Sequence, residues 1–218
     1  MKSQYWFDCV LELMVDFWHL VFSIDKLMVR FGTILYQWRG VIGFIAFWIV
    51  WYFSRPGWLM IAIGLPFTII GLILRFWASG YIGKESRSKE LRVTSLITNG
   101  PYRFIRNPLY LGNFFLTLGI LLGMNLPSYF IGAIIVLFWV YYAMIIKAEH
   151  DFLIQKFGEK YLSYCKATRA VIPKNFFKKT LSDESQQYEF RNAKKEFQTI
   201  IMMLLIYVII YLRMIRKF

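Results

Sequence analysis

Long apolar runs dominate this sequence and restrict what it can fold into. The run "VIGFIAFWIVWYF" at residues 41–53 is one of several that approach the roughly 20 residues an α-helix needs to cross the ~30 Å hydrocarbon layer of a bilayer. Hydrophobic residues fill 58% of the 218 positions, and the mean hydropathy is +0.47. The sequence therefore predicts an all-α fold, a polytopic helical bundle in a membrane.

The formal net charge is +13, from 26 Lys and Arg against 13 Asp and Glu. In a soluble protein such a charge would make nucleic acid a candidate partner. Here the positive residues cluster beside the apolar runs, as juxtamembrane residues facing anionic lipid do. We therefore expect membrane lipid, and not nucleic acid, as the partner of these residues. By their spacing, Cys9 and Cys165 make neither a disulfide framework nor a metal site, and no metal is expected.

Breaks between the apolar runs predict four spanning helices, at residues 36–53, 58–81, 109–124 and 128–146. The turns "SRPG" (54–57) and "NLP" (125–127) separate two pairs of them, and Pro66 predicts a kink. A fifth run, 200–212, is short for a span, so a crossing helix and a tilted, re-entrant or partner-packed helix both stay open.

Charged positions divide the chain into three predicted parts. Residues 1–35 carry Asp8, Glu12 and Asp16 at helical spacing among apolar residues, which predicts an amphipathic helix at the membrane interface. Residues 36–173 form the predicted transmembrane core. Residues 174–218 form a basic tail and the apolar C-terminal helix.

Charge asymmetry predicts the orientation of the spans. The connection at residues 82–108 carries six Lys and Arg, whereas the turn at 125–127 carries no charge, so the longer connection should be cytoplasmic. The basic segment after residue 147 then falls on the same side. If residues 200–212 crossed the membrane, Arg213, Arg216 and Lys217 would lie outside the cell. That would conflict with the tendency of Lys and Arg to stay on the cytoplasmic side.

A polar motif, "NGPYRFIRNPLYLGN" (99–113), leads into the third predicted span. Pro101 and Pro108 restrict the residues before them to extended conformations, and Gly100 permits a turn. Irregular backbone at membrane depth is tolerated only where it is buried in protein or lines a cavity, so the motif indicates a pocket. The alternative is that its two arginines bind lipid phosphates and its tyrosines belong to the interfacial aromatic belt.

Two segments resemble the membrane methyltransferases that include isoprenylcysteine carboxyl methyltransferase and phospholipid N-methyltransferase. They are "GPYRFIRNPLYLGN" (100–113) and "AEHDFLIQKFGEKYLSYCKATRAVIP" (148–173), and the resemblance extends from about residue 75 to residue 173. It implies an integral-membrane enzyme with S-adenosylmethionine as methyl donor, bound on the cytoplasmic side between these segments.

The family pattern is Arg-His-Pro-x-Tyr-x-Gly or Asn-Pro-x-Tyr. Residues 106–112 match it here, with Asn107 at the position that is His in the first form. That asparagine is typical of the phospholipid enzymes, whereas the preceding "GPYRFIR" is closer to the isoprenylcysteine branch. The motif therefore does not indicate which of the two substrate classes applies. The family's Glu-Glu pair is Glu149-His150 in this chain, which keeps the first carboxylate.

The resemblance and the chemistry of the donor together assign candidate residues. Arg103 or Asn107 would bind the donor's carboxylate, and Glu149 its ammonium or ribose. Its adenine and sulfonium would contact aromatic rings, for which the candidates are Tyr102, Tyr110 and Tyr161. The planar guanidinium of Arg106 would orient the acceptor's oxygens, which makes Arg106 and Glu149 the candidate catalytic residues.

Other polar residues in the same segments have simpler interpretations. For an amine acceptor, Glu149, His150 or Asp151 would take the departing proton. Otherwise His150 is expected to be an exposed or helix-capping histidine, and Arg75 to extend toward the membrane surface. The carboxylate of Glu149 should pair with Arg103, Arg106 or the cofactor.

Three functions of different classes fit these observations. The first is a lipid-directed methyltransferase, with an anionic carboxylate or phosphate oxygen favoured as acceptor by the basic pocket and a phospholipid amine as the alternative. The second is a membrane reductase that uses the pocket for a nicotinamide cofactor. The third is a non-catalytic membrane partner protein, which the presence of both motifs disfavours.

A cysteine introduced at Ser88 tests the orientation. Because the connection is predicted to be cytoplasmic, this cysteine should resist an impermeant thiol reagent in intact cells and react once the cells are opened. The unaltered chain controls for Cys9 and Cys165. Ready labelling in intact cells would reverse the orientation and move the predicted pocket to the other face.

Overall fold

A computed structural model describes residues 2–82, 95–171 and 186–216, with side chains from residue 27 onward. Its main helices are α1 (Lys2–Phe53), α2 (Trp58–Ile82), α3 (Pro108–Gly123), α4 (Ser128–Phe157), α5 (Glu159–Ala167), α6 (Phe190–Ala193) and α7 (Phe197–Arg216). Two short 3₁₀ helices, η2 (Gly100–Arg103) and η3 (Lys194–Glu196), complete the described elements. The predicted all-α class is confirmed.

Four helical segments in the described part of the chain are long and apolar enough to cross a membrane: Leu27–Phe53, Trp58–Ile82, Ser128–Phe157 and Phe190–Arg216. Only 11–17% of the residues in their most apolar stretches are buried within the chain, so most of their apolar side chains face outward. In a membrane that surface contacts lipid. The predicted span at 109–124 corresponds to α3, which is shorter than these four segments. The C-terminal run at 200–212 lies within the long segment Phe190–Arg216.

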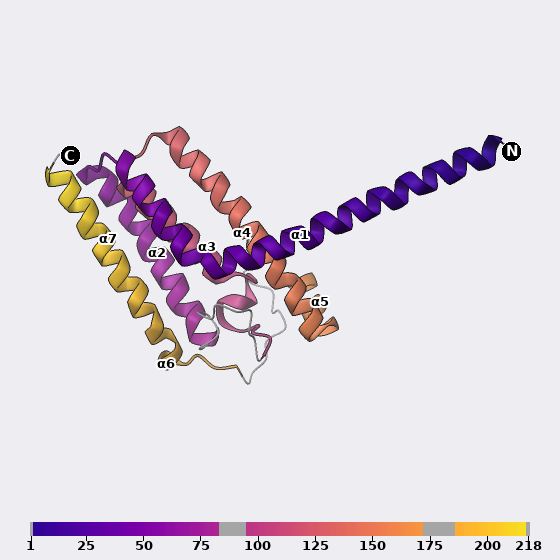
Figure 1. Ribbon diagram of the computed structural model, residues 1–218. Coiled ribbons are helices and arrows are strands. Elements are labelled where there is room, and N and C mark those ends of the chain that lie inside the picture. Colours follow the sequence, from indigo (N-terminus) through magenta and orange to yellow (C-terminus); the bar gives the residue numbers. More distant parts are fainter. Residues whose placement is uncertain (1, 83–94, 172–185, 217–218) are drawn as a thin grey trace.

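Two helices extend further than the hydrophobic pattern indicates. Helix α1 continues through residue 36 without a break, and Figure 1 shows its N-terminal part projecting from the bundle. The side chains of Asp8, Glu12 and Asp16 lie outside the described residues, so the interfacial stripe stays a prediction. Helix α4 runs past residue 146 as far as Phe157, because the next helix breaker after that position is Gly158, whose φ is +51°.

Glycines allow α2 and α3 to approach each other closely. Gly64 and Gly71 on α2, like Gly112 and Gly119 on α3, are seven residues apart and so share one face of each helix. A Cβ at Gly71 would lie 2.8 Å from the carbonyl oxygen of Gly112, and one at Gly119 would lie 2.7 Å from that of Gly64. Small residues at such crossings are how membrane helices gain packing contacts where lipid removes the hydrophobic driving force.

The remaining helices assemble around this pair. Helix α1 packs along α4, whereas α7 lies along α2 (Figure 1). The Thr68 hydroxyl on α2 lies 2.7 Å from the Tyr207 hydroxyl on α7, and these two helices also contact α3. The connection that carries Ser88 falls outside the described residues, so its side of the membrane stays a prediction.

At the end of the bundle away from η2, Arg213 joins α7 to the turn between α1 and α2. Its Nε donates to the carbonyl oxygen of Ser54 at 3.0 Å and its Nη2 to that of Tyr52 at 2.9 Å. Its guanidinium also lies 4.3 Å from the ring centre of Trp51. The positive charge that conflicted with the expected orientation therefore binds the unpaired carbonyls at the C-terminus of α1.

Substitution of Gly119 by alanine tests the helix crossing. The added methyl would collide with Thr68 Oγ1 and the Gly64 backbone, so we expect Gly119→Ala to lower the thermal unfolding temperature in detergent, at a cost of about 1–3 kcal/mol for an overpacked contact. Gly132→Ala on α4 is the control, because nothing lies within 4 Å of its Cβ position. Equal unfolding temperatures for the two variants would contradict the assigned crossing.

Candidate active site

The two segments that carry the family resemblance are joined through their backbones. Ile105 and Arg169 form an isolated parallel bridge, and the Arg106 N–H donates to the Arg169 carbonyl at 2.9 Å. The backbone N–H and the side-chain amide of Asn107 both donate to the carbonyl of Ala170, at 3.0 and 3.1 Å. The loop before α3 is thereby held against the chain that follows α5.

A buried tyrosine reinforces this junction. The hydroxyl of Tyr164 on α5 donates to the Tyr102 carbonyl at 2.5 Å. Burial raises the pKa of Tyr164 far above its usual range, so the hydroxyl keeps its proton and remains a donor. Tyr164 packs with Leu96 and Tyr161 in a small apolar cluster. The η2 loop is therefore fixed by both backbone and side-chain contacts.

A cavity of about 560 Å³ lies where these segments meet α1, α2, α4 and α7. Its volume falls within the range of about 300–1,000 Å³ typical of small-molecule sites. Of the seven predicted site residues, six line it: Tyr102, Arg106, Asn107, Tyr110, Glu149 and Tyr161. Arg103 does not line the cavity. Residues predicted from two separate motifs are thus brought to one place.

Glu149 contributes a carboxylate to the cavity wall. It accepts a hydrogen bond from the Tyr110 hydroxyl, and not from Arg103 or Arg106, two of the three partners that the sequence suggested. The third, the cofactor, stays a prediction. Arg39 on α1 lines the same cavity and attracts the carboxylate electrostatically. Its guanidinium lies 4.1 Å from the ring centre of Tyr36.

Two polar groups in the cavity wall have no hydrogen-bond partner within the described part of the chain. They are the Nε of Arg106 and the hydroxyl of Tyr102. Burial raises the pKa of Tyr102 well above its usual range, so this hydroxyl stays protonated. Arg106 uses its Nη1 to contact the Cys165 sulfur. Buried donors of this kind are costly unless something binds them, which points to a ligand.

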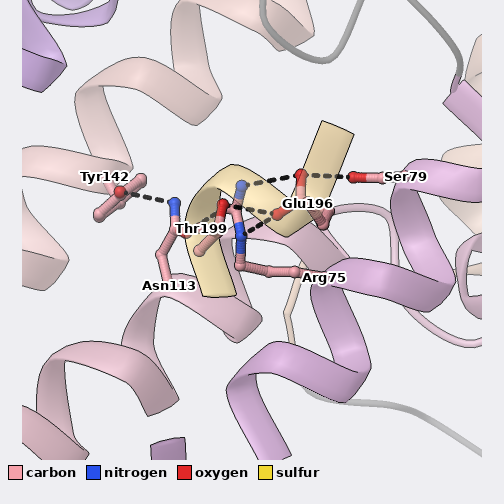
Figure 2. Close-up of polar contacts among 6 residues, drawn as sticks. All are labelled: Arg75, Ser79, Asn113, Tyr142, Glu196 and Thr199. Atoms are coloured by element: carbon pink, nitrogen blue, oxygen red, sulfur yellow. Dashed lines mark hydrogen bonds and ion pairs between the residues drawn. The ribbon is translucent and has the colours of Figure 1, made fainter. Parts of the chain in front are cut away.

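Arg75 does not extend to the membrane surface as the sequence led us to expect. Its Nε donates to Glu196 at 2.9 Å in an ion pair whose side chains are only 15% and 2% exposed (Figure 2). A charge at membrane depth is held by an opposite charge because hydration is absent there. His150 is partly buried, and its Nδ1 lies 3.1 Å from the Tyr161 hydroxyl, so it is neither freely exposed nor a helix cap.

Sequence reasoning missed four polar cavity or near-cavity residues: Tyr36, Arg39, Asn113 and Glu196. The pairing of Arg75 with Glu196 had a detectable basis, because Arg75 is an isolated charge within an apolar run and Glu196 is the carboxylate directly before the C-terminal apolar run. The argument applied to Glu149, that such a charge needs a partner, applies equally to them. Arg39 is also a charge within an apolar run, but the residues it meets depend on how α1 packs against α4.

The part of the chain that builds the cavity is similar to known methyltransferases. The sequence profile described as "Phospholipid methyltransferase" matches residues 59–160, which include α2, α3, α4 and the loop before α3. A protein-S-isoprenylcysteine O-methyltransferase of Dictyostelium discoideum is 31% identical over 147 residues, covering 61% of this chain and 58% of that protein. The resemblance to the membrane methyltransferases is confirmed.

Two bacterial relatives carry different names. The cobalt-zinc-cadmium resistance protein CzcN of Cupriavidus metallidurans is 29% identical over 143 residues, covering 63% of this chain and 62% of the relative. The nickel-cobalt-cadmium resistance protein NccN of Alcaligenes xylosoxydans xylosoxydans is 32% identical over 117 residues, covering 53% and 50%. Alignments with the three relatives thus span only about half to three fifths of their lengths. No solved structure matches the chain significantly.

Proposed function

We propose that this chain transfers a methyl group from S-adenosylmethionine to a lipid or lipidated acceptor. The observation that carries the proposal is a cavity at one end of the membrane helices that both resembling segments line and that contains unpaired buried donors. The methyltransferase family match supports methyl transfer over a reductase with a nicotinamide cofactor. The cytoplasmic side of the site is proposed from the charge asymmetry alone.

The residues of the cavity fit the chemical groups of the donor. Its carboxylate would be bound by Arg39 or by the unpaired Tyr102 hydroxyl, and its ammonium by the Glu149 carboxylate. Tyr110 and Tyr161 offer rings for the adenine and the sulfonium. Asn107 lines the cavity, but its amide already donates to Ala170, so its first role is to hold the loop. Arg103 would act outside the cavity.

The bound donor would supply an electrophilic methyl group on a positively charged sulfur. Arg106, through its unpaired Nε, would orient the acceptor's oxygens in line with that methyl group. Apolar side chains in the wall, including Ile97, Leu109 and Phe152, would exclude water. Positioning and exclusion of water are the main requirements for this class of displacement.

An anionic oxygen, of a carboxylate or a phosphate, is the proposed acceptor class. Arg39 and Arg106 give the cavity two cations against the one carboxylate of Glu149, and the charge of Arg75 is balanced by Glu196. An anionic acceptor needs no base. A phospholipid amine is the alternative, for which Glu149 would accept the departing proton. Comparing the lipids and prenylated thiols of cells with and without the protein by mass spectrometry would identify the acceptor.

Binding of the donor is the first test. Purified protein should bind S-adenosylmethionine or its demethylated product in the micromolar range, about −8 kcal/mol, in calorimetry. The nicotinamide cofactors NADH and NADPH serve as controls and should bind at least about tenfold more weakly, a difference of about 1.4 kcal/mol. Tighter binding of a nicotinamide cofactor would favour the reductase, and no binding of either methyl compound would remove the proposal.

Alanine variants separate the roles of Arg106 and Glu149. Arg106→Ala should keep donor affinity and lower turnover by about a hundredfold, as for loss of one donor to a reacting oxygen. Glu149→Ala should weaken donor binding by about 2 kcal/mol, the value of a charge-assisted hydrogen bond. Donor affinity, turnover and monodispersity are measured in one detergent.

Two exposed residues provide matched controls for these variants. Arg55→Ala lies at the opposite end of the bundle, and Glu159→Ala lies at the start of α5. Neither should change affinity or turnover. If Arg106→Ala abolished donor binding while Glu149→Ala left it unchanged, the two assigned roles would be wrong.

A further inference from the structure

Figure 2 shows a cluster of polar side chains that joins the C-terminal part of the chain to α2, α3 and α4. Arg75, Asn113 and Thr199 of this cluster line the cavity. At the centre of the cluster is Glu196, which is 1% exposed. Its carboxylate accepts hydrogen bonds from Arg75 Nε and Nη2 at 2.9 and 3.1 Å, from Ser79 Oγ at 2.8 Å and from Thr199 Oγ1 at 2.9 Å. A carboxylate held by so many donors has one fixed orientation, and so does the guanidinium that faces it.

The contacts continue from Arg75 across the bundle to the proposed donor site. Arg75 Nη1 donates to the Asn113 side-chain oxygen, and the Asn113 amide donates to the Tyr142 hydroxyl at 2.9 Å. The ring of Tyr142 packs against that of Tyr110 with centroids 4.8 Å apart. The Tyr110 hydroxyl in turn donates to Glu149. The series therefore passes from η3 through α2, α3 and α4 without a gap.

We propose that Glu196 is a positioning residue for the active site. By fixing the guanidinium of Arg75, it sets the orientation of Asn113 and, through the contacts just described, of the Tyr110–Glu149 pair. The inference rests on the proposed function in that Glu149 is taken as the carboxylate that binds the donor. It extends the site to a segment beyond residue 160, where the family match ends.

The position of the cluster supports a role in the site beyond holding α7 in place. Arg75 and Asn113 both line the cavity, so a change in their orientation changes the cavity wall. Helix α7 also contributes Gln198, Thr199 and Met202 to that wall. Without Glu196, the Arg75 charge would face the cavity without this counter-ion, and the cavity's electrostatic field would change.

Three variants test this role. Glu196→Gln keeps the size of the side chain and removes its charge. Tyr142→Phe keeps the ring that packs against Tyr110 and removes only the hydroxyl that binds Asn113. Glu189→Gln is the matched control, because it makes the same chemical change in the same segment at a side chain that is 56% exposed.

The main measurement does not depend on donor binding. It is the rate at which dicyclohexylcarbodiimide, an apolar reagent for carboxyl groups, labels Glu149. The full-length protein is labelled and then digested, and the labelled Glu149 peptide is quantified by mass spectrometry. Glu196→Gln and Tyr142→Phe should each change this rate by about fivefold in the same direction, the effect of one lost hydrogen bond. The double variant should change it no further, because both act through one series of contacts. Glu189→Gln should match the unaltered protein.

Donor affinity is measured on the same samples with S-adenosylhomocysteine as probe. It should fall in Glu196→Gln and Tyr142→Phe and stay constant in Glu189→Gln. Failure of the unaltered protein to bind the probe would refute the proposed function, while the labelling rates would still decide whether Glu196 positions Glu149. The two proposals therefore fail separately.

A purely structural role gives a different pattern. Glu196→Gln would then lower the unfolding temperature while Glu149 labelling and probe affinity stayed native, and that result would overturn the proposal. Additive effects in the double variant would overturn the series of contacts. If Glu196→Gln is not recovered as monodisperse protein, Ser79→Ala and Thr199→Val take its place in the same measurements. Each of these variants removes one hydrogen bond to the Glu196 carboxylate.

Discussion

The close approach of α2 and α3 is the constraint on which the rest of this structure depends. Glycines on both helices bring the backbones together, and one end of the crossing places Arg75 beside Gly112, directly before Asn113. Were the helices further apart, Arg75 could not reach both Asn113 on α3 and Glu196 on η3. The crossing therefore positions the polar residues as well as the apolar ones, and the cavity forms at the end of the bundle where they gather.

Lipid gives each polar group in this bundle a strong requirement for a partner, and the chain meets that requirement in two ways. Arg213 binds backbone carbonyls at one end, and Arg75 binds a carboxylate nearer the other. The few buried donors that lack a partner in the described residues include two in the cavity wall, Tyr102 and Arg106. Unpaired donors in the wall of a cavity of this size are suited to binding a ligand.

Local pattern was enough to predict the helical fold, and the loop before α3 as the edge of a pocket, because proline, glycine and apolar runs act on their immediate neighbours. It could not predict the ends of α1 and α4, since residues 1–35 and 147–157 are too polar to stand out as spans yet contain no proline, and α1 accommodates Gly32. Site residues next to the motifs were identifiable, whereas Arg39 and Glu196 depend on which helices pack together. Arg103 is the reverse case, because its place in the motif predicted a site residue and the structure places it outside the cavity wall.

The Arg75–Glu196 pair also has a consequence for how the protein is made. Arg75 enters the membrane 121 positions ahead of its carboxylate partner, so during synthesis it must remain hydrated, or held by the insertion machinery, until η3 and α7 arrive. Until then α2 and α3 can cross, but the cavity lacks one wall. Assembly of the cavity is therefore tied to the arrival of η3 and α7, and a product truncated before Glu196 would retain an unpaired charge that quality-control proteases in the membrane can recognise.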